Sequence, residues 1–335
     1  MIVRETQDKN GPNQATLGRL FKGYLASRNN DKSPGQSLPT RWITPGDLAA
    51  TSGPVVYRLG HSSMLLKLDD AYLLVDPVFS ERASPLQWAG PKRFHPVPLL
   101  PRALPPLKAV LISHDHYDHL DRGAIELLAA NVEHFVVPTG VGSHLVRWGV
   151  DRARIIELGW WQAATLGSIR LTATPAQHFS GRGLHDRNKT LWASWVIESD
   201  EARLFFSGDG GYFDGFAAIG ARFGGFDLTM VETGAYNRLW SHIHMLPEQS
   251  LQAHLDLRGA AMMPIHNSTF DLSFHSWYEP LEQASRLASR RGVELVTPVI
   301  GAPVNPLAPT GTYAWWRAVD DLGLKLGATP LSSAV

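Results

Sequence analysis

The chain has 335 residues, 44% of them hydrophobic and 19% charged, which is enough to bury a large core as one α/β unit or as two domains. Its 31 basic and 31 acidic side chains cancel, which argues against a nucleic-acid-binding protein because that class usually carries a basic surface. It contains no cysteine, so disulfides and thiolate metal sites are excluded, and any metal must be held by histidine and carboxylate side chains.

The N-terminal segment shows no targeting signal. Its first ten residues lack the apolar core of a secretory signal, and no apolar run in the chain approaches the roughly 20 residues that cross a bilayer. We therefore expect a cytoplasmic protein. Residues 1–50 read as a polar extension in which apolar side chains recur at helical spacing from Leu17 to Leu25. We expect this short amphipathic helix either to pack on its own domain or on the mate of a homodimer, or to contact the inner face of the membrane.

From residue 51 the pattern changes to short apolar strands. Three of them, over 55–59, 64–68 and 71–75, predict an antiparallel meander. A proline-rich segment over 78–106 follows, and loops of this length are usually functional. Further strands are expected at 108–112, 134–138, 155–158, 169–178, 192–198, 203–206, 227–231 and 260–266. Helices are expected after Asp121 and at 142–148, 247–258 and 279–291.

These elements alternate and predict one α/β domain over residues 51–306. Residues 307–335 read as a tail rich in alanine, proline and glycine. We expect part of this tail to pack on the domain, because it contains Trp315 and Trp316.

One stretch, from His114 to Asp121, carries three histidines and three aspartates directly after an expected buried strand. Alternate side chains of an extended segment point the same way, so His114 and His116 face one side together. Asp118 and His119 come after the chain begins to turn and can converge on a neighbouring point. Carboxylates this close repel one another unless cations offset them. The stretch therefore predicts ligands for a pair of metal ions.

Three more potential ligands follow other apolar strands, and strand ends beside loops are where α/β proteins place their sites. These ligands are His178, Asp209 and His266. The first metal is assigned to His114, His116 and His178. The second metal is assigned to Asp118, His119 and His266. Asp209 can supply one carboxylate oxygen to each metal.

Such a site would generate a nucleophile. Metal-bound water has its pKa lowered from about 15.7 to about 7–9, so hydroxide forms at neutral pH. Two metals about 3.5–4 Å apart can hold that hydroxide and stabilise oxygens of the transition state. This chemistry suits hydrolysis of phosphate esters, carboxylic esters, lactones or amides, with Asp118 and Asp209 as catalytic ligands.

The motif His114-x-His116-x-Asp118-His119, with the later ligands, resembles the metallo-β-lactamase superfamily. The resemblance covers residues 54–300 and implies an αββα sandwich of two mixed β-sheets flanked by helices. Shorter motifs resemble, within that superfamily, the N-acyl-phosphatidylethanolamine-hydrolysing phospholipase D group. They are Gly60-His61 and residues 76–85, 90–94, 175–178, 188–192, 234–236 and 265–270.

That group, by this resemblance, uses two zinc ions and cleaves a phosphodiester of a membrane lipid, releasing phosphatidic acid and an N-acylethanolamine. The superfamily equivalent of Asp76 orients a ligand histidine from behind. Two positions differ from the group: Gly181 stands where a lysine is expected, and Ile243 where a glutamine is expected. Both line the substrate side, so the resemblance bears on the metal chemistry more directly than on the lipid.

Other side chains are candidates for contact with the substrate. His244 lies in a polar loop before a helix and could polarise a phosphoryl oxygen or protonate a leaving group, with a purely structural role as the alternative. The candidates for binding a phosphate or another part of the substrate are Arg182, His185, Lys189 and Tyr117. For each basic residue among them, an ordinary surface position is the competing interpretation. His61 is a weaker candidate.

We therefore expect a di-zinc hydrolase that cleaves the phosphodiester of an N-acyl-phosphatidylethanolamine-like phospholipid. The alternative is a carboxylic ester or lactone hydrolase, including one for sugar-phosphate lactones, on the same two metals. Redox di-iron proteins of the superfamily usually place glutamate where His116 stands and carry a flavin domain, and neither feature is present. The expected partner is a small-molecule or phospholipid substrate and no nucleic acid.

Overall fold

The computed structural model describes residue 27, residues 30–310 and residues 313–321. The amphipathic helix expected over Leu17–Leu25 lies outside these residues. The described part of the N-terminal extension contains helix α2 (Pro45–Ala50), which Thr44 caps with its side chain. Leu38 and Ile43 of this extension are buried, so the segment packs on the rest of the protein.

The first sheet has seven strands in the order β14-β1-β2-β3-β4-β5-β6. Strands β1 (Val55–Gly60), β2 (Ser63–Leu68) and β3 (Ala71–Val75) form the expected antiparallel meander. Strands β4 (Leu107–Leu111), β5 (Val132–Pro138) and β6 (Ile155–Leu158) continue from β3 in parallel. The short strand β14 (Pro303–Val304) pairs with β1 at the other edge.

The second sheet repeats this plan in the order β13-β12-β11-β10-β9-β8-β7. Its antiparallel strands are β7 (Ala163–Leu166), β8 (Ile169–Thr174), β9 (Ser194–Glu198) and β10 (Arg203–Phe206). Its parallel strands continue from β10 and are β11 (Phe226–Glu232), β12 (Gly259–Ile265) and β13 (Glu294–Leu295). The carboxyl ends of β10, β11 and β12 therefore meet at one edge of this sheet.

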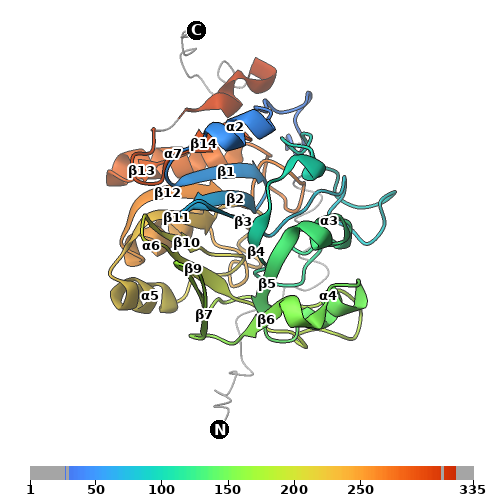
Figure 1. Ribbon diagram of the computed structural model, residues 1–335. Helices are drawn as coiled ribbons and strands as arrows, with labels where there is room; N and C mark the ends of the chain where they lie inside the picture. The colour runs from blue at the N-terminus through green and yellow to red at the C-terminus, as the bar shows by residue number, and fades with distance from the viewer. Residues whose placement is uncertain (1–26, 28–29, 311–312, 322–335) are drawn as a thin grey trace.

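Helices cover the outer face of each sheet (Figure 1). Helices α3 (Arg122–Leu128) and α4 (Gly142–Arg147) contribute Ile125 and Leu145 to a core shared with the first sheet. Helices α5 (Gly215–Phe223), α6 (Pro247–Asp256) and α7 (Glu279–Arg291) share a core with the second sheet. A third apolar cluster joins the two sheets face to face. The expected αββα sandwich of two mixed sheets is confirmed.

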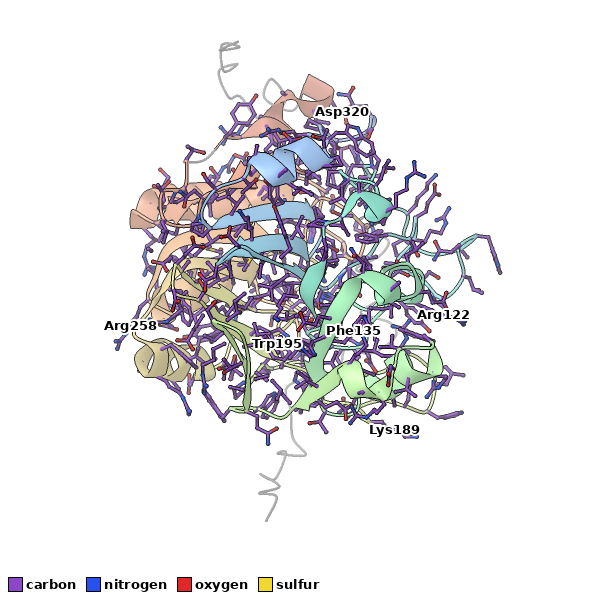
Figure 2. All side chains as sticks on the ribbon, in the orientation of Figure 1. Arg122, Phe135, Lys189, Trp195, Arg258 and Asp320 are labelled. Atoms are coloured by element: carbon purple, nitrogen blue, oxygen red, sulfur yellow. The ribbon has the colours of Figure 1, made fainter. Side chains whose placement is uncertain are left out.

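The largest side chain between the sheets is Trp195 of β9, which is fully buried (Figure 2). Its indole Nε1 donates a hydrogen bond to the carbonyl of Ile112 at 3.1 Å, because a buried N–H needs a partner. Ile112 directly precedes the predicted metal-binding stretch. The packing of the core and the position of that stretch are thereby coupled.

The sequence patterns did not indicate five of these elements: α2, α5, β7, β13 and β14. Helix α5 has the sequence GFAAIGARF, and its two glycines lower its intrinsic helix propensity. Its buried residues Phe216 and Ile219 pack on the second sheet, so tertiary contacts stabilise a helix that local preference disfavours.

The C-terminal segment packs as expected where it is described. Trp315 and Trp316 are buried in a cluster with Leu38 and Trp277. In the described part of the chain, no helix is long and apolar enough to cross a membrane.

Candidate metal centre

The loop after β4 presents the first group of possible metal ligands. His114 Nε2 lies 2.8 Å from His116 Nδ1, and His178 Nε2 lies 3.3 Å from the same nitrogen. Asp209 Oδ2 is 3.8 Å from His114 Nε2 and 3.9 Å from His178 Nε2. Among the described residues, one ligand atom from each of these four lies within 4.8 Å of the others. The geometry brings together the ligands assigned to the first metal.

A second group forms directly beside the first. The carboxylate Oδ2 of Asp118 lies 3.2 Å from His266 Nε2 and 3.6 Å from His119 Nε2. His61 Nε2 completes the group at 3.1 Å from the same oxygen. His61 is therefore a fourth possible ligand of this group, although it was only a weaker candidate in the sequence.

Asp209 connects the two groups. Its Oδ1 lies 3.0 Å from His119 Nε2, and its Oδ2 lies 2.9 Å from His266 Nε2 while facing the first group. Gly208 before it has φ +58, and a Cβ there would lie 2.8 Å from the Ser113 Cβ. Glycine is thus required for the tight turn that aims this carboxylate between the groups.

Several buried polar atoms at this centre have no hydrogen-bond partner among the described residues. Two of them, His119 Nε2 and Asp209 Oδ1, face one another 3.0 Å apart; the other two are the Nδ1 atoms of His61 and His266, whose Nε2 atoms face Asp118. Buried polar atoms are normally paired, and unpaired ones that face one another at imidazole and carboxylate groups fit a bound cation. The donor set suits a borderline metal such as zinc.

The protonation states of the first group also suit a metal. Burial lowers the pKa of His114 and His178 well below the usual range, so both imidazoles are neutral, the form that binds metal. Burial opposes ionisation of Asp209, but the neighbouring His119 and His266 hold the pKa of its carboxyl well below its usual range. Asp209 is therefore a carboxylate that is ready to coordinate.

Asp76 lies behind the second group, as expected from the resemblance to the superfamily, in which the equivalent carboxylate orients a ligand histidine. It is fully buried, and its Oδ2 lies 2.7 Å from His119 Nδ1. The backbone N–H of Ser113 donates to its Oδ1 at 2.7 Å, and the Ser113 hydroxyl donates to its Oδ2 at 2.5 Å. This carboxylate therefore fixes both the imidazole of His119 and the start of the loop that carries it.

The loop after β12 is held in an unusual backbone conformation. His266 has φ 63 and Ser268 has φ 57, a left-handed region that costs non-glycine residues about 1–2 kcal/mol each. The buried guanidinium of Arg58 donates from Nη2 to the Asn267 carbonyl at 2.6 Å and to its side-chain oxygen at 2.9 Å. The His266 N–H also donates to the His61 carbonyl. These bonds offset the strain that turns His266 toward the centre.

Glu232 was missed by the sequence reasoning. It is fully buried at the end of β11, where one carboxylate oxygen hydrogen-bonds His244 Nδ1 and also lies 3.9 Å from His266 Nδ1. Its other oxygen accepts from the Gly210 N–H at 2.6 Å. A signal was available: an acid ends an apolar strand between the strands that carry Asp209 and His266.

His244 lies at the rim of the centre. Its side chain is 16% exposed, and its ring is 5.3 Å from that of His178 and 5.4 Å from that of His266. With Asp209, Glu232 and His266 it forms a third group of possible ligands. The structure therefore places this predicted catalytic side chain where either a substrate or a metal could meet it.

The predicted substrate-binding residues are more scattered. The Tyr117 hydroxyl donates to the Arg182 carbonyl at 2.8 Å, and the Arg182 guanidinium stacks 4.0 Å from the Tyr117 ring centroid. Arg182 Nη1 also donates to the carbonyls of Asp115 and Leu120. This guanidinium thus braces the metal-binding loop from outside.

His185 and Lys189 are exposed and join none of the three groups of possible ligands. They lie in the loop that buried Asp115 ties to the metal-binding stretch, through the Gly181 N–H and the Thr190 hydroxyl. Their use as anion ligands stays a prediction.

Comparison with known proteins points in the same direction as the geometry. A model of the beta-lactamase superfamily domain matches residues 71–267. The chain is 43% identical over 305 residues to an uncharacterized protein of Mycobacterium tuberculosis. This alignment covers 89% of this chain and 81% of that protein. It is 32% identical over 296 residues to N-acyl-phosphatidylethanolamine-hydrolyzing phospholipase D 1 of Caenorhabditis elegans, covering 82% of this chain and 83% of that enzyme.

Solved structures share the fold at low identity. An isothiocyanate hydrolase from Delia radicum gut bacteria matches with a TM-score of 0.60 and 17% identity, over 77% of this chain and 100% of that chain. CmlA, a diiron beta-hydroxylase from Streptomyces venezuelae, matches with a TM-score of 0.56 and 15% identity, over 76% of this chain and 55% of that chain. Since one is a hydrolase and the other a diiron hydroxylase, the chemistry must be argued from the site.

Proposed function

This chain belongs to the beta-lactamase superfamily and is a metal-dependent hydrolase, and we propose that it uses two zinc ions to cleave a phosphodiester of an N-acyl-phosphatidylethanolamine-like phospholipid. The observation that carries the proposal is the pair of adjacent ligand groups joined by the Asp209 carboxylate. One group offers three imidazoles and the other offers Asp118 with imidazoles. Both donor sets suit zinc.

Bound zinc ions would supply an activated water at neutral pH and a Lewis acid for phosphoryl oxygens. The protein's own part is to place the groups around the phosphodiester. The carboxylates of Asp209 and Asp118 would hold the metals by their negative charge, and the burial of Asp209 would strengthen that attraction. His244 has Nδ1 engaged by Glu232, which leaves Nε2 to meet a phosphoryl oxygen or the leaving group.

The substrate class is supported by the relatives. The Caenorhabditis elegans relative and a mitochondrial one from Saccharomyces cerevisiae, 33% identical over 244 residues, are both named for hydrolysis of N-acyl-phosphatidylethanolamine. The first of these comparisons spans most of both chains. We therefore favour a phosphodiester over a carboxylic ester or a lactone as the substrate.

The test combines metal content with a panel of substrates. The purified protein is analysed for metals and assayed against N-acyl-phosphatidylethanolamine, bis(p-nitrophenyl) phosphate, a lactone and a β-lactam. We expect close to two zinc equivalents per chain and release of an N-acylethanolamine. Iron as the main metal would overturn the zinc assignment. Turnover of the lactone with none of either phosphodiester would replace the proposed substrate class.

A further inference from the structure

The loop over residues 179–190, which follows β8, is anchored to the metal-binding stretch. Buried Asp115 accepts hydrogen bonds from the Gly181 N–H at 2.7 Å and from the Thr190 hydroxyl at 2.9 Å, near the two ends of the loop. The Arg182 guanidinium donates to the carbonyl of Asp115 at 2.6 Å. The position of this loop is therefore fixed relative to the candidate metal ligands.

The two arms of the loop also hold one another. The Asn188 N–H donates to the Ser180 carbonyl at 3.0 Å, and the Ser180 hydroxyl donates to the Thr190 carbonyl at 2.7 Å. Gly181 has φ +141, and a Cβ at this position would lie 3.2 Å from the Cα of Arg187. Glycine thus lets the first arm approach the second, and this contact fixes the backbone of Arg187.

The side chain of Arg187 stacks on an aromatic ring that contacts candidate metal ligands. Its guanidinium carbon lies 4.2 Å from the ring centroid of Phe179. That centroid lies 4.5 Å from the ring centroid of His116 and 4.8 Å from that of His178, two of the ligands assigned to the first metal. A single aromatic ring therefore separates the Arg187 guanidinium from the first ligand group.

The charge of Arg187 is exposed and unpaired. Among the residues that the structure describes, its guanidinium has no hydrogen-bond or ion-pair partner, and stacking leaves the N–H groups in the guanidinium plane free to donate. The guanidinium of Arg182 is instead engaged by the carbonyls of Asp115 and Leu120. Lys189 lies at the periphery of the molecule (Figure 2). Arg187 is thus a cation next to the metal centre that is available to a ligand.

We propose that Arg187, supported by Phe179, binds an anionic phosphoryl oxygen of the substrate and selects a phosphodiester over a neutral ester. A guanidinium forms a planar fork that matches phosphate oxygens, and stacking on a ring preorganises it. A neutral ester or lactone offers no charge to this fork, so the contact favours the phosphodiester. The inference rests on the proposed function, because it names the part of the proposed substrate that this loop recognises.

The test compares an anionic with a neutral substrate on the zinc-loaded full chain. Arg187→Ala should raise KM for bis(p-nitrophenyl) phosphate about tenfold and leave kcat nearly unchanged, because it removes one charge-assisted contact. The parameters for p-nitrophenyl acetate should not change. Arg187→Lys keeps the charge and should restore part of the KM. Since the guanidinium is exposed, the difference should shrink in about 1 M salt, where the Debye length is about 3 Å.

A matched control is Arg222→Ala, because Arg222 also stacks on an aromatic ring, that of Trp161 at 4.8 Å. Arg222 is in the last turn of α5, next to the start of β11, so it lies at the edge of the second sheet opposite to the carboxyl ends of β10 and β11. Its substitution should leave both substrates unaffected. Phe179→Leu removes the supporting ring, so Arg187→Ala should have a smaller effect on KM in that background.

Titration calorimetry with inorganic phosphate measures the same contact without turnover. The zinc-loaded chain should bind phosphate, and Arg187→Ala should weaken this binding about tenfold. Such a result in a protein that cleaves no phosphodiester would uphold the anion contact and refute the proposed function.

Other results would overturn the anion contact. An unchanged KM for the phosphodiester in Arg187→Ala would do so, and so would equal changes for the anionic and the neutral substrate. A lower metal content in Arg187→Ala would show that the residue supports the metal centre instead. A chain that neither cleaves the phosphodiester nor binds phosphate would refute both the anion contact and the proposed function.

Discussion

The Asp76 carboxylate of the first sheet and the Glu232 carboxylate of the second occupy comparable places behind the metal centre. Both are fully buried, and burial raises the pKa of both despite the histidines beside them. Asp76 contacts His119, a possible ligand, and the Ser113 N–H. Glu232 contacts His244, at the rim, and the Gly210 N–H. Each carboxylate thus fixes one imidazole and one loop of the centre.

The difference between the two carboxylates lies in the imidazole that each one serves. Asp76 should act mainly on metal affinity, because His119 faces both Asp118 and Asp209. Glu232 should act mainly on turnover, because its nearest imidazole is exposed to the substrate side. Substitutions around the centre test this distinction.

The largest effect is expected for Asp209→Ala, since this carboxylate connects both ligand groups. Loss of the metals would remove several kcal/mol of transition-state stabilisation, so turnover should fall by about a thousandfold or more. Elemental analysis should show less metal per chain. Asp214→Ala, at an exposed position nearby, is the control. Normal activity in Asp209→Ala would show that the two groups are not bridged by this residue.

The second largest loss of turnover is expected for His244→Ala. Loss of a group that moves or stabilises a proton typically lowers turnover about 100-fold or more. Metal content should remain that of the unmodified protein, as measured by elemental analysis, and His242→Ala, at an exposed neighbour, should have little effect. Loss of metal would instead make His244 a ligand of the third group.

Glu232→Gln should lower kcat by about 10–100-fold while metal content is kept, because an amide holds the His244 imidazole less firmly. The steady-state parameters on a soluble phosphodiester report kcat separately from KM. Glu232→Asp, which keeps the charge, should restore part of the rate. If Glu232→Gln lost as much metal as Asp76→Asn, the two carboxylates would both act on metal affinity, and the distinction between them would be wrong.

Asp76→Asn should lower metal affinity by about 10–100-fold, the usual cost of losing the partner of a ligand histidine. At saturating zinc the rate should recover most of the way, which makes this the smallest effect on turnover. Titration with zinc, followed by activity, measures the shift. A rate that stays low at saturating zinc would place Asp76 in the chemistry itself.

Much of the fold was predictable from the sequence because its elements carry local signals. The meander β1–β3 has alternating apolar runs and tight turns, and α7 has a glycine directly after its last residue. Helix α5 was not predicted, because its glycines lower the helix propensity of the segment. The packing of Phe216 and Ile219 on the second sheet stabilises it. The pairing of two similar sheets was expected from family resemblance and not from periodicity.

The seven candidate ligands could be predicted from the sequence alone, because each one follows an apolar strand and together they form a cluster of histidines and acids. The side chains that complete the site could not be predicted in this way, because they come together only in the folded chain. His61 and Glu232 join it because the ends of β1 and β11, which belong to different sheets, come together at the centre. Arg182 turns its guanidinium onto backbone carbonyls of the metal-binding loop. Such contacts depend on the alignment of separate strands and loops, which no local pattern records.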